Sequence, residues 1–88
     1  MSESRPPRVV VTDHACDRYR QRVRGTLDPR AEITARVARA WAAGSYARGE
    51  RGTVRVQDLD RRDLVYVCRH DIPGGELIVV TLWGAGLP

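Results

Sequence analysis

The chain has 88 residues, of which 42% are hydrophobic and 30% are charged. This length allows one domain with a thin core and excludes a cofactor-binding domain beside a substrate domain, and the composition is that of a globular chain rather than a disordered one. The formal net charge is +4, and all fifteen basic residues are arginine. An anionic partner is therefore favoured, because guanidinium groups bind phosphate and carboxylate in a bidentate manner.

The polar residues 1–7 include two prolines and predict a flexible arm, followed by a single domain over residues 8–88. The longest strongly apolar run, residues 77–83, has the length of a strand and is too short to cross a membrane. The amino-terminal residues do not have the pattern of a signal peptide. We therefore expect a cytoplasmic protein that does not contact a membrane.

The residue pattern predicts an α+β domain with the element order β-α-α-β-β-β. A β-branched strand over residues 8–12 precedes a helix that is capped by Thr12 or Asp13 and stopped by Gly25. A second helix begins at the Asp-Pro pair at 28–29, which supplies an N-cap residue followed by proline at the first helical position.

After the glycine at position 44, the period of the apolar residues changes from 3.6 to 2. Strands are predicted over 53–57, 64–70 and 77–83, and residues 45–48 are open as a further short strand. The sequence between 71 and 75 predicts a hairpin loop. Helices in one block followed by strands in another indicate an antiparallel sheet with both helices packed on one face.

His14, Arg18 and Arg22 recur every four residues along the first helix, beside its predicted apolar stripe. Cations stacked at this spacing repel one another by a few tenths of a kcal/mol. We call these three side chains the ridge. One interpretation is that the ridge binds phosphate, with His14 able to move a proton. The other is that Arg18 and Arg22 pair with acids at 58, 60 or 63, while His14 is a surface or capping residue.

Two further features each allow two interpretations. Trp83 and Thr81 share one face of an alternating strand, so Trp83 either packs in the core or, where that face is open, stacks on a nucleic-acid base. Cys16 and Cys68 are small buried hydrophobes or form a disulfide, since the chain shows no zinc-ligand spacing.

Residues 12–23 resemble the opening helix of a family of small, largely uncharacterised bacterial and phage domains. The family signature, His-Ala-x-x-Arg-x-x-x-Arg, is matched by His14, Ala15, Arg18 and Arg22, and residues 79–81 match its last strand. This family is thought to share the fold of the RelE and BrnT toxins, which include metal-independent ribonucleases. The resemblance implies a RelE-like fold, RNA as the ligand, a site role for Thr81, and a small acidic antitoxin-like protein as a partner.

Metal-free cleavage of RNA needs a base for the 2′-hydroxyl, an acid for the leaving oxygen and cations near the phosphate. His14 and His70 can serve as the base and the acid. Phosphate and other nucleic-acid contacts are predicted for five residues: Arg18, Arg22, Arg69, Tyr66 and Thr81. No metal or other cofactor is expected, because the acids at 58, 60 and 63 lack the glycine and the distal glutamate of a calcium loop and should be solvated.

The function predicted from the sequence is RNA binding, with metal-independent cleavage as its catalytic form. One alternative is a nucleic-acid-binding module that has no catalytic activity. The other is a protein-interaction module whose arginines dock an acidic partner. Exposed sheet edges in so small a domain also leave a homodimer open.

Overall fold

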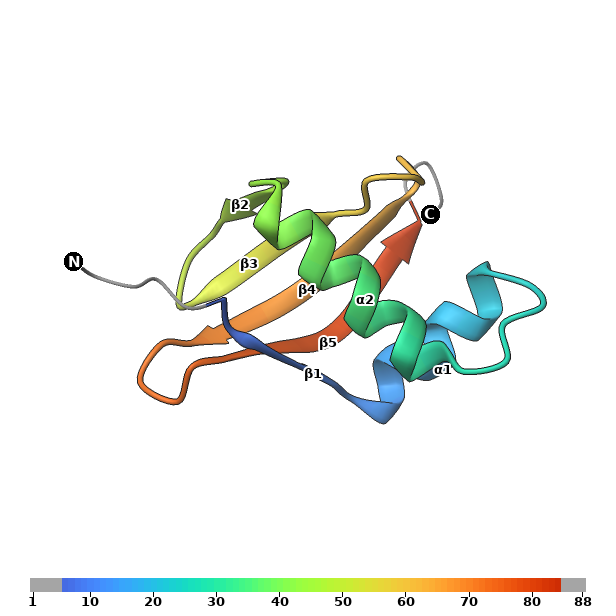
Figure 1. Ribbon diagram of the computed structural model, residues 1–88, viewed down its shortest axis with the longest axis horizontal. Coiled ribbons are helices and arrows are strands. Elements are labelled where there is room, and N and C mark those ends of the chain that lie inside the picture. Colours follow the sequence, from blue (N-terminus) through green and yellow to red (C-terminus); the bar gives the residue numbers. More distant parts are fainter. Residues whose placement is uncertain (1–5, 85–88) are drawn as a thin grey trace.

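Two helices lie across one face of a five-stranded sheet in the computed structural model of the chain (Figure 1), which describes residues 6–84. In chain order, the elements are β1 (Arg8–Val11), α1 (Asp13–Arg22), α2 (Pro29–Ala42), β2 (Tyr46–Arg48), β3 (Thr53–Gln57), β4 (Leu64–Asp71) and β5 (Glu76–Gly84). The predicted α+β class, with both helices on one face, is confirmed. Residues 1–5 of the predicted arm, and 85–88 of the predicted domain, lie outside the described residues.

The strands lie side by side in the order β1-β5-β4-β3-β2. Every neighbouring pair is antiparallel except β1 and β5, which are parallel. The sheet is therefore mostly antiparallel, as expected, with the parallel pair of β1 and β5 as the one departure. Residues 46–48, within the segment that the sequence left open as a strand, form β2. No hairpin turn joins β1 to β5, so no turn fixes the relative direction of these two strands.

The helix boundaries follow from capping residues in the sequence. Thr12 caps α1, and its hydroxyl oxygen accepts a hydrogen bond from the backbone N–H of Ala15. Asp28 caps α2 in the same way, through the N–H of Ala31. The first helix ends at Arg22, slightly earlier than predicted, because the next residue is already extended.

A β-bulge interrupts the pairing of β4 with β5. Val67 lies opposite Thr81 while Cys68 lies opposite Val79, so Val80 is the extra residue on β5. The bulge shifts the alternation of β5 by one residue and turns Thr81 and Trp83 away from the helices. The hydroxyl of Thr12 lies 3.1 Å from the carbonyl oxygen of Val79 and 3.0 Å from that of Val80, which fastens the start of α1 to the bulge.

The core lies between the helices and the inward-facing residues of the sheet. Tyr19 and Tyr66 are its largest fully buried side chains. Cys16 and Cys68 are both buried and free, so the interpretation as buried hydrophobes is confirmed over the disulfide. Burial raises the pKa of the Cys68 thiol to about 12.

Asp58 is a buried charged residue at the boundary of this core, with 3% of its surface exposed. Its carboxylate accepts hydrogen bonds from the Tyr66 hydroxyl at 2.7 Å and from Arg36 Nη1 at 3.0 Å. The backbone N–H groups of Asp60 and Arg61 also donate to it, at 2.9 and 2.8 Å. Burial alone would raise the pKa of Asp58, but these donors outweigh it and lower the pKa. The expectation that this acid is solvated is therefore wrong for Asp58.

Replacing Asp58 with asparagine should lower the free energy of unfolding at pH 7 by about 3 kcal/mol, because Arg36 then becomes a poorly compensated cation beside the core. Asp60→Asn is the matched control and should change it by less than about 1 kcal/mol, since Asp60 is an exposed partner of Arg39. Urea unfolding measures both.

The contribution of Asp58 to the free energy of unfolding depends on pH. Because the folded-state pKa of Asp58 is lowered, this contribution is complete above the unfolded-state pKa of about 3.9 and is lost as the pH falls through the folded-state pKa. The difference between wild type and Asp58→Asn should therefore shrink at acid pH, and a pH-independent difference would contradict this assignment.

Candidate nucleic-acid interface

The face of the sheet that points away from the helices carries a mixture of arginine, hydroxyl, amide and apolar side chains. The strand register aligns these side chains in three rows across the sheet: Gln57, Val65 and Trp83; Arg55, Val67 and Thr81; and Thr53, Arg69, Ile78 and Val10. We call these ten residues the helix-free face. All of them are partly or well exposed, whereas the residues between them on the central strands are buried.

Trp83 is the aromatic residue of the helix-free face, and 46% of its surface is exposed. The guanidinium carbon of Arg55 lies 5.2 Å from the centroid of the Trp83 ring, which is the geometry of a cation–π contact. Thr81 and Trp83 share this face, as the sequence predicted, and the face is open. The interpretation of Trp83 as a core residue is therefore wrong, and its ring is available for stacking.

Two of the residues predicted to contact nucleic acid, Arg69 and Thr81, lie on the helix-free face. Arg69 is exposed and lies opposite Thr53 and Ile78, and Thr81 lies opposite Val67. Arg55 was not predicted as a site residue, although the sequence contains the signal. Its neighbours at 54 and 56 are the apolar residues of an alternating strand, so Arg55 must point to the opposite face.

The ridge on α1 has no carboxylate partner among residues 6–84. The acids at 58, 60 and 63 form ion pairs with Arg36, Arg39 and Arg61, and not with Arg18 or Arg22. Both ridge arginines are half-buried, and the Nε atom of Arg18 is buried without a hydrogen-bond partner. The structure thus contradicts the interpretation in which these acids neutralise the ridge.

The ridge lies along the carboxyl-terminal half of β5. β1 pairs with β5 only as far as Val79, and α1 continues from there, packed against both β5 and α2. A hollow between α1 and the start of α2 is lined by Cys16, Asp17 and Arg20, so the ridge occupies the flank of α1 away from α2. Hydrogen bonds from Arg61 are the main cause that lowers the pKa of Asp63, and the charge of Arg22 lowers it further.

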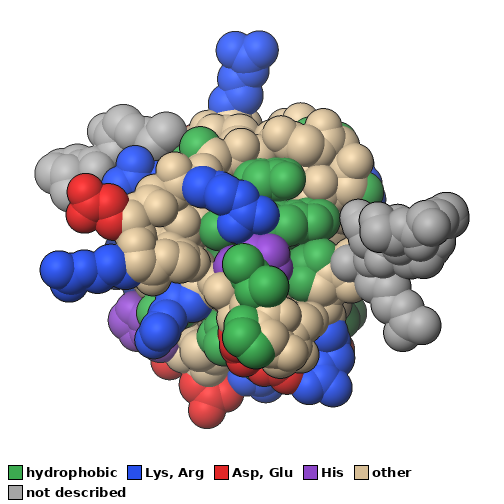
Figure 2. Space-filling view, turned by 90° about the vertical axis from the view of Figure 1, so that its left-hand side faces the viewer, with side chains coloured by type: hydrophobic (Ala, Val, Ile, Leu, Met, Phe, Trp, Pro, Cys, Tyr) green, Lys and Arg blue, Asp and Glu red, His purple; other side chains and the backbone are tan. Residues whose placement is uncertain are grey.

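The two predicted catalytic histidines do not come together. His14 is exposed on the first turn of α1. His70 lies near the end of β4, opposite Leu77, whereas α1 begins beyond Val11, which lies opposite Val79 and two strands away from β4. They form two separate patches on the surface (Figure 2). These two histidines therefore do not form a general acid–base pair.

Tyr66 was predicted to contact nucleic acid, and the structure corrects this. Its side chain is fully buried, and its hydroxyl donates to Asp58. Burial and this hydrogen bond raise its pKa far above the ordinary value. The physical reason is alternation along β4, which turns Tyr66 inward with Leu64 and Cys68 and turns Arg69 outward.

No three His, Cys, Asp or Glu side chains within residues 6–84 lie close enough together to hold a metal ion. Neither α1 nor α2 is long and apolar enough to span a membrane.

At pH 11, at least two of the three tyrosines should remain protonated in the folded protein. Burial and the hydrogen bond to Glu32 raise the pKa of Tyr19 to about 12, and Tyr66 titrates at still higher pH. Absorbance of tyrosinate in the ultraviolet measures this, with the urea-unfolded chain as the control in which all three titrate near the ordinary value of about 10. Ionisation of all three at pH 11 without unfolding would show that Tyr66 is accessible after all.

Comparison of the chain with protein-family models, curated proteins and solved structures finds no match. The likeness of residues 12–23 and 79–81 to the family of small bacterial and phage domains, and the RelE-like fold that it implies, therefore stay predictions from the sequence. The geometry around β5 is the ground on which a function can be inferred.

Proposed function

We propose that the protein binds single-stranded nucleic acid, preferentially RNA, along β5. The observation that carries this proposal is the exposed ring of Trp83 beside Arg55, which has no carboxylate partner among the described residues. Arg69 lies on the same face of the sheet, and Arg18 and Arg22 lie on the flank of α1 away from α2. The interface therefore combines an aromatic platform with cations on two sides.

This combination suits an unpaired strand. Exposed bases stack on aromatic rings and on guanidinium planes, and each stacked base contributes about 1–3 kcal/mol in known complexes. Here a base would stack on Trp83 or on the guanidinium of Arg55, while Arg69 and the ridge would contact the phosphates on either side. Thr81 adds a hydroxyl group on the same face. The preference for RNA rests on the resemblance of α1 to the family of small bacterial and phage domains, which is thought to share the fold of ribonuclease toxins.

A short fluorescent single-stranded RNA of about 10 nucleotides is a suitable probe, because sites of this type cover about 4–16 nucleotides. We expect Trp83→Leu to weaken binding at least fivefold, because one stacked base is lost. We expect Arg55→Ala/Arg69→Ala to weaken it at least tenfold and to reduce its salt dependence, because fewer counterions are released. Fluorescence anisotropy over a salt series measures both effects.

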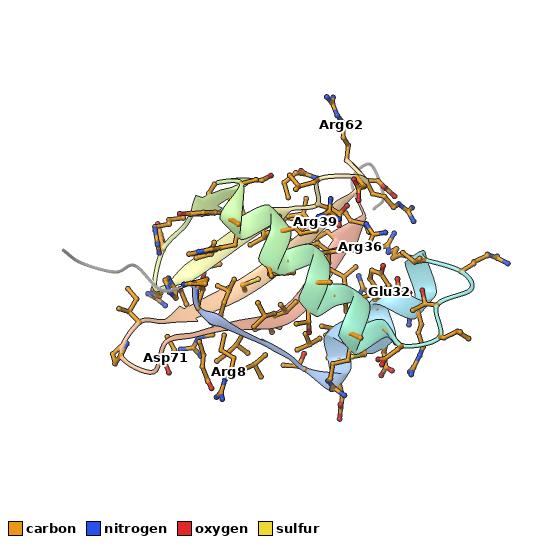
Figure 3. The ribbon with its side chains drawn as sticks, viewed as in Figure 1. Arg8, Glu32, Arg36, Arg39, Arg62 and Asp71 are labelled. Atoms are coloured by element: carbon orange, nitrogen blue, oxygen red, sulfur yellow. The ribbon has the colours of Figure 1, made fainter. Side chains whose placement is uncertain are left out.

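Arg62→Ala is the matched control for charge. Arg62 projects away from the body of the protein (Figure 3). The substitution Arg62→Ala should therefore leave the affinity for RNA nearly unchanged. Equal losses in Arg62→Ala and in the double variant would show only non-specific attraction to a basic protein and would contradict the proposed interface. Binding of an acidic antitoxin-like protein to this face in place of RNA, or self-association through it, would favour the interaction-module alternative.

Cleavage is a second candidate function, and the position of His14 on the same helix face as Arg18 and Arg22 supports it. Any metal-free cleavage on this interface must take its histidine from α1, because His70 lies elsewhere. In EDTA, we therefore expect any RNA cleavage by the wild type to be lost in His14→Ala and kept in His70→Ala. Equal loss in both variants would contradict the separation of the two histidines. RNA that stays bound but intact would identify a binding module without catalytic activity.

A further inference from the structure

We propose that a second site, at the end of the molecule where α2 meets β2, binds a nucleoside monophosphate, namely the terminal nucleotide of the strand held on the helix-free face. The identification of this nucleotide as the end of a bound strand depends on the proposed function. The site is a cleft of about 620 Å³ lined by nine residues: Pro6, Pro7, Arg8, Trp41, Tyr46, Arg48, His70, Ile72 and Gly75. We call it the aromatic cleft. Its volume is within the range of small-molecule sites, about 300–1,000 Å³.

The aromatic wall of the cleft is built by a short connection between α2 and β2. Trp41 lies in the last turn of α2 and Tyr46 begins β2, and the chain turns between them at Gly44, whose φ of 75° is in the left-handed region. The two rings stack with their centroids 4.0 Å apart and their planes 7° apart. The ring of His70 meets Trp41 edge-on at 5.1 Å. Three elements thus hold these rings in fixed positions.

Arg48 gives the cleft a cation. Its guanidinium carbon lies 5.7 and 5.8 Å from the ring centroids of Trp41 and Tyr46, and it has no carboxylate partner among residues 6–84. Its Nη1 atom lies 3.2 Å from His70 Nδ1. Because a guanidinium only donates, Nδ1 is the acceptor in this contact, which leaves Nε2 as the nitrogen of His70 that can donate to a ligand. Donors from Arg48 and His70 therefore lie beside an aromatic surface.

A fixed guanidinium next to aromatic rings matches a ligand that is both planar and anionic. A nucleobase would contact the rings, and its phosphate would bind Arg48. Figure 2 looks onto this end of the molecule, where a histidine at the centre lies against an arginine and several hydrophobic side chains. The cation of Arg8 is already paired with Glu76, which leaves Arg48 as the anion-binding group of the cleft within the described residues.

The aromatic cleft and the helix-free face are connected around the end of the sheet. A smaller hollow between them is lined by Arg51, Arg69, His70 and Ile78, among others. Arg69 and Ile78 belong to the helix-free face, whereas His70 also lines the aromatic cleft. A strand whose backbone follows Arg69 and Arg51 would therefore reach the cleft with its end.

The two tryptophans of the chain make the site testable by fluorescence. In Trp83→Leu, Trp41 is the only tryptophan and reports on the aromatic cleft. We expect adenosine 5′-monophosphate to change its emission in a saturable way, and adenosine to bind at least tenfold more weakly. Adding Arg48→Ala should lower the affinity for the monophosphate to that for adenosine, whereas adding Arg62→Ala should not change it.

No saturable change, or a change that does not depend on Arg48, would overturn the proposal. Inorganic phosphate that competes as well as the monophosphate would also overturn it, since the rings would then contribute nothing. The reciprocal variant Trp41→Phe leaves Trp83 to report on the helix-free face. RNA that changes Trp83 emission while the monophosphate fails to affect Trp41 would refute the cleft and keep the proposed function. The opposite result would refute RNA binding on the sheet and leave a mononucleotide site.

Discussion

The buried carboxylate of Asp58 is the interaction on which the arrangement of the helices and the sheet depends. It joins Arg36 on α2 to Tyr66 on β4 and to the backbone of the turn between β3 and β4. A second hydrogen bond, from the Tyr19 hydroxyl to Glu32, ties α1 to α2 nearby. A charge buried in this way is tolerated only when its donors are complete, so the helices have little freedom to shift over the sheet.

This network also decides which arginines remain available for a ligand. The acids of the turn before β4 are used by Arg36, Arg39 and Arg61, of which the first two lie on α2 (Figure 3). The helix-free face and the hairpin between β2 and β3 contain few acids in return. The arginines of α2 are thus partly neutralised, whereas Arg48, Arg51, Arg55 and Arg69, on the hairpin between β2 and β3 and on the strands beside it, have no carboxylate partner among the described residues. Such segregation gives a weakly basic protein a directed basic surface.

Local chemistry in the sequence was enough to predict the helices, their caps and the alternation of the strands. The alternation of apolar residues along the strands also indicates that Tyr66 points inward and Arg55 points outward, although neither position was predicted from it. The separation of His14 from His70 was not predictable, because it depends on the strand order and on the parallel placement of β1. The aromatic cleft joins α2, β2 and β4, and no local pattern reports that Trp41 and His70 meet.

The hairpin between β2 and β3 connects the two proposed binding regions, and its backbone is held in an unfavourable conformation there. Arg51 has a φ of 58°, which costs a residue with a side chain about 1–2 kcal/mol relative to the right-handed region. The adjacent Gly52 accepts a hydrogen bond from the backbone N–H of His70 at 2.8 Å, which fixes the turn against β4. A flexible turn would leave the Arg51 side chain to sample many positions. Because this turn is fixed, the Arg51 side chain starts from a defined point at the hollow between the helix-free face and the aromatic cleft, where a strand running from one to the other would place a phosphate.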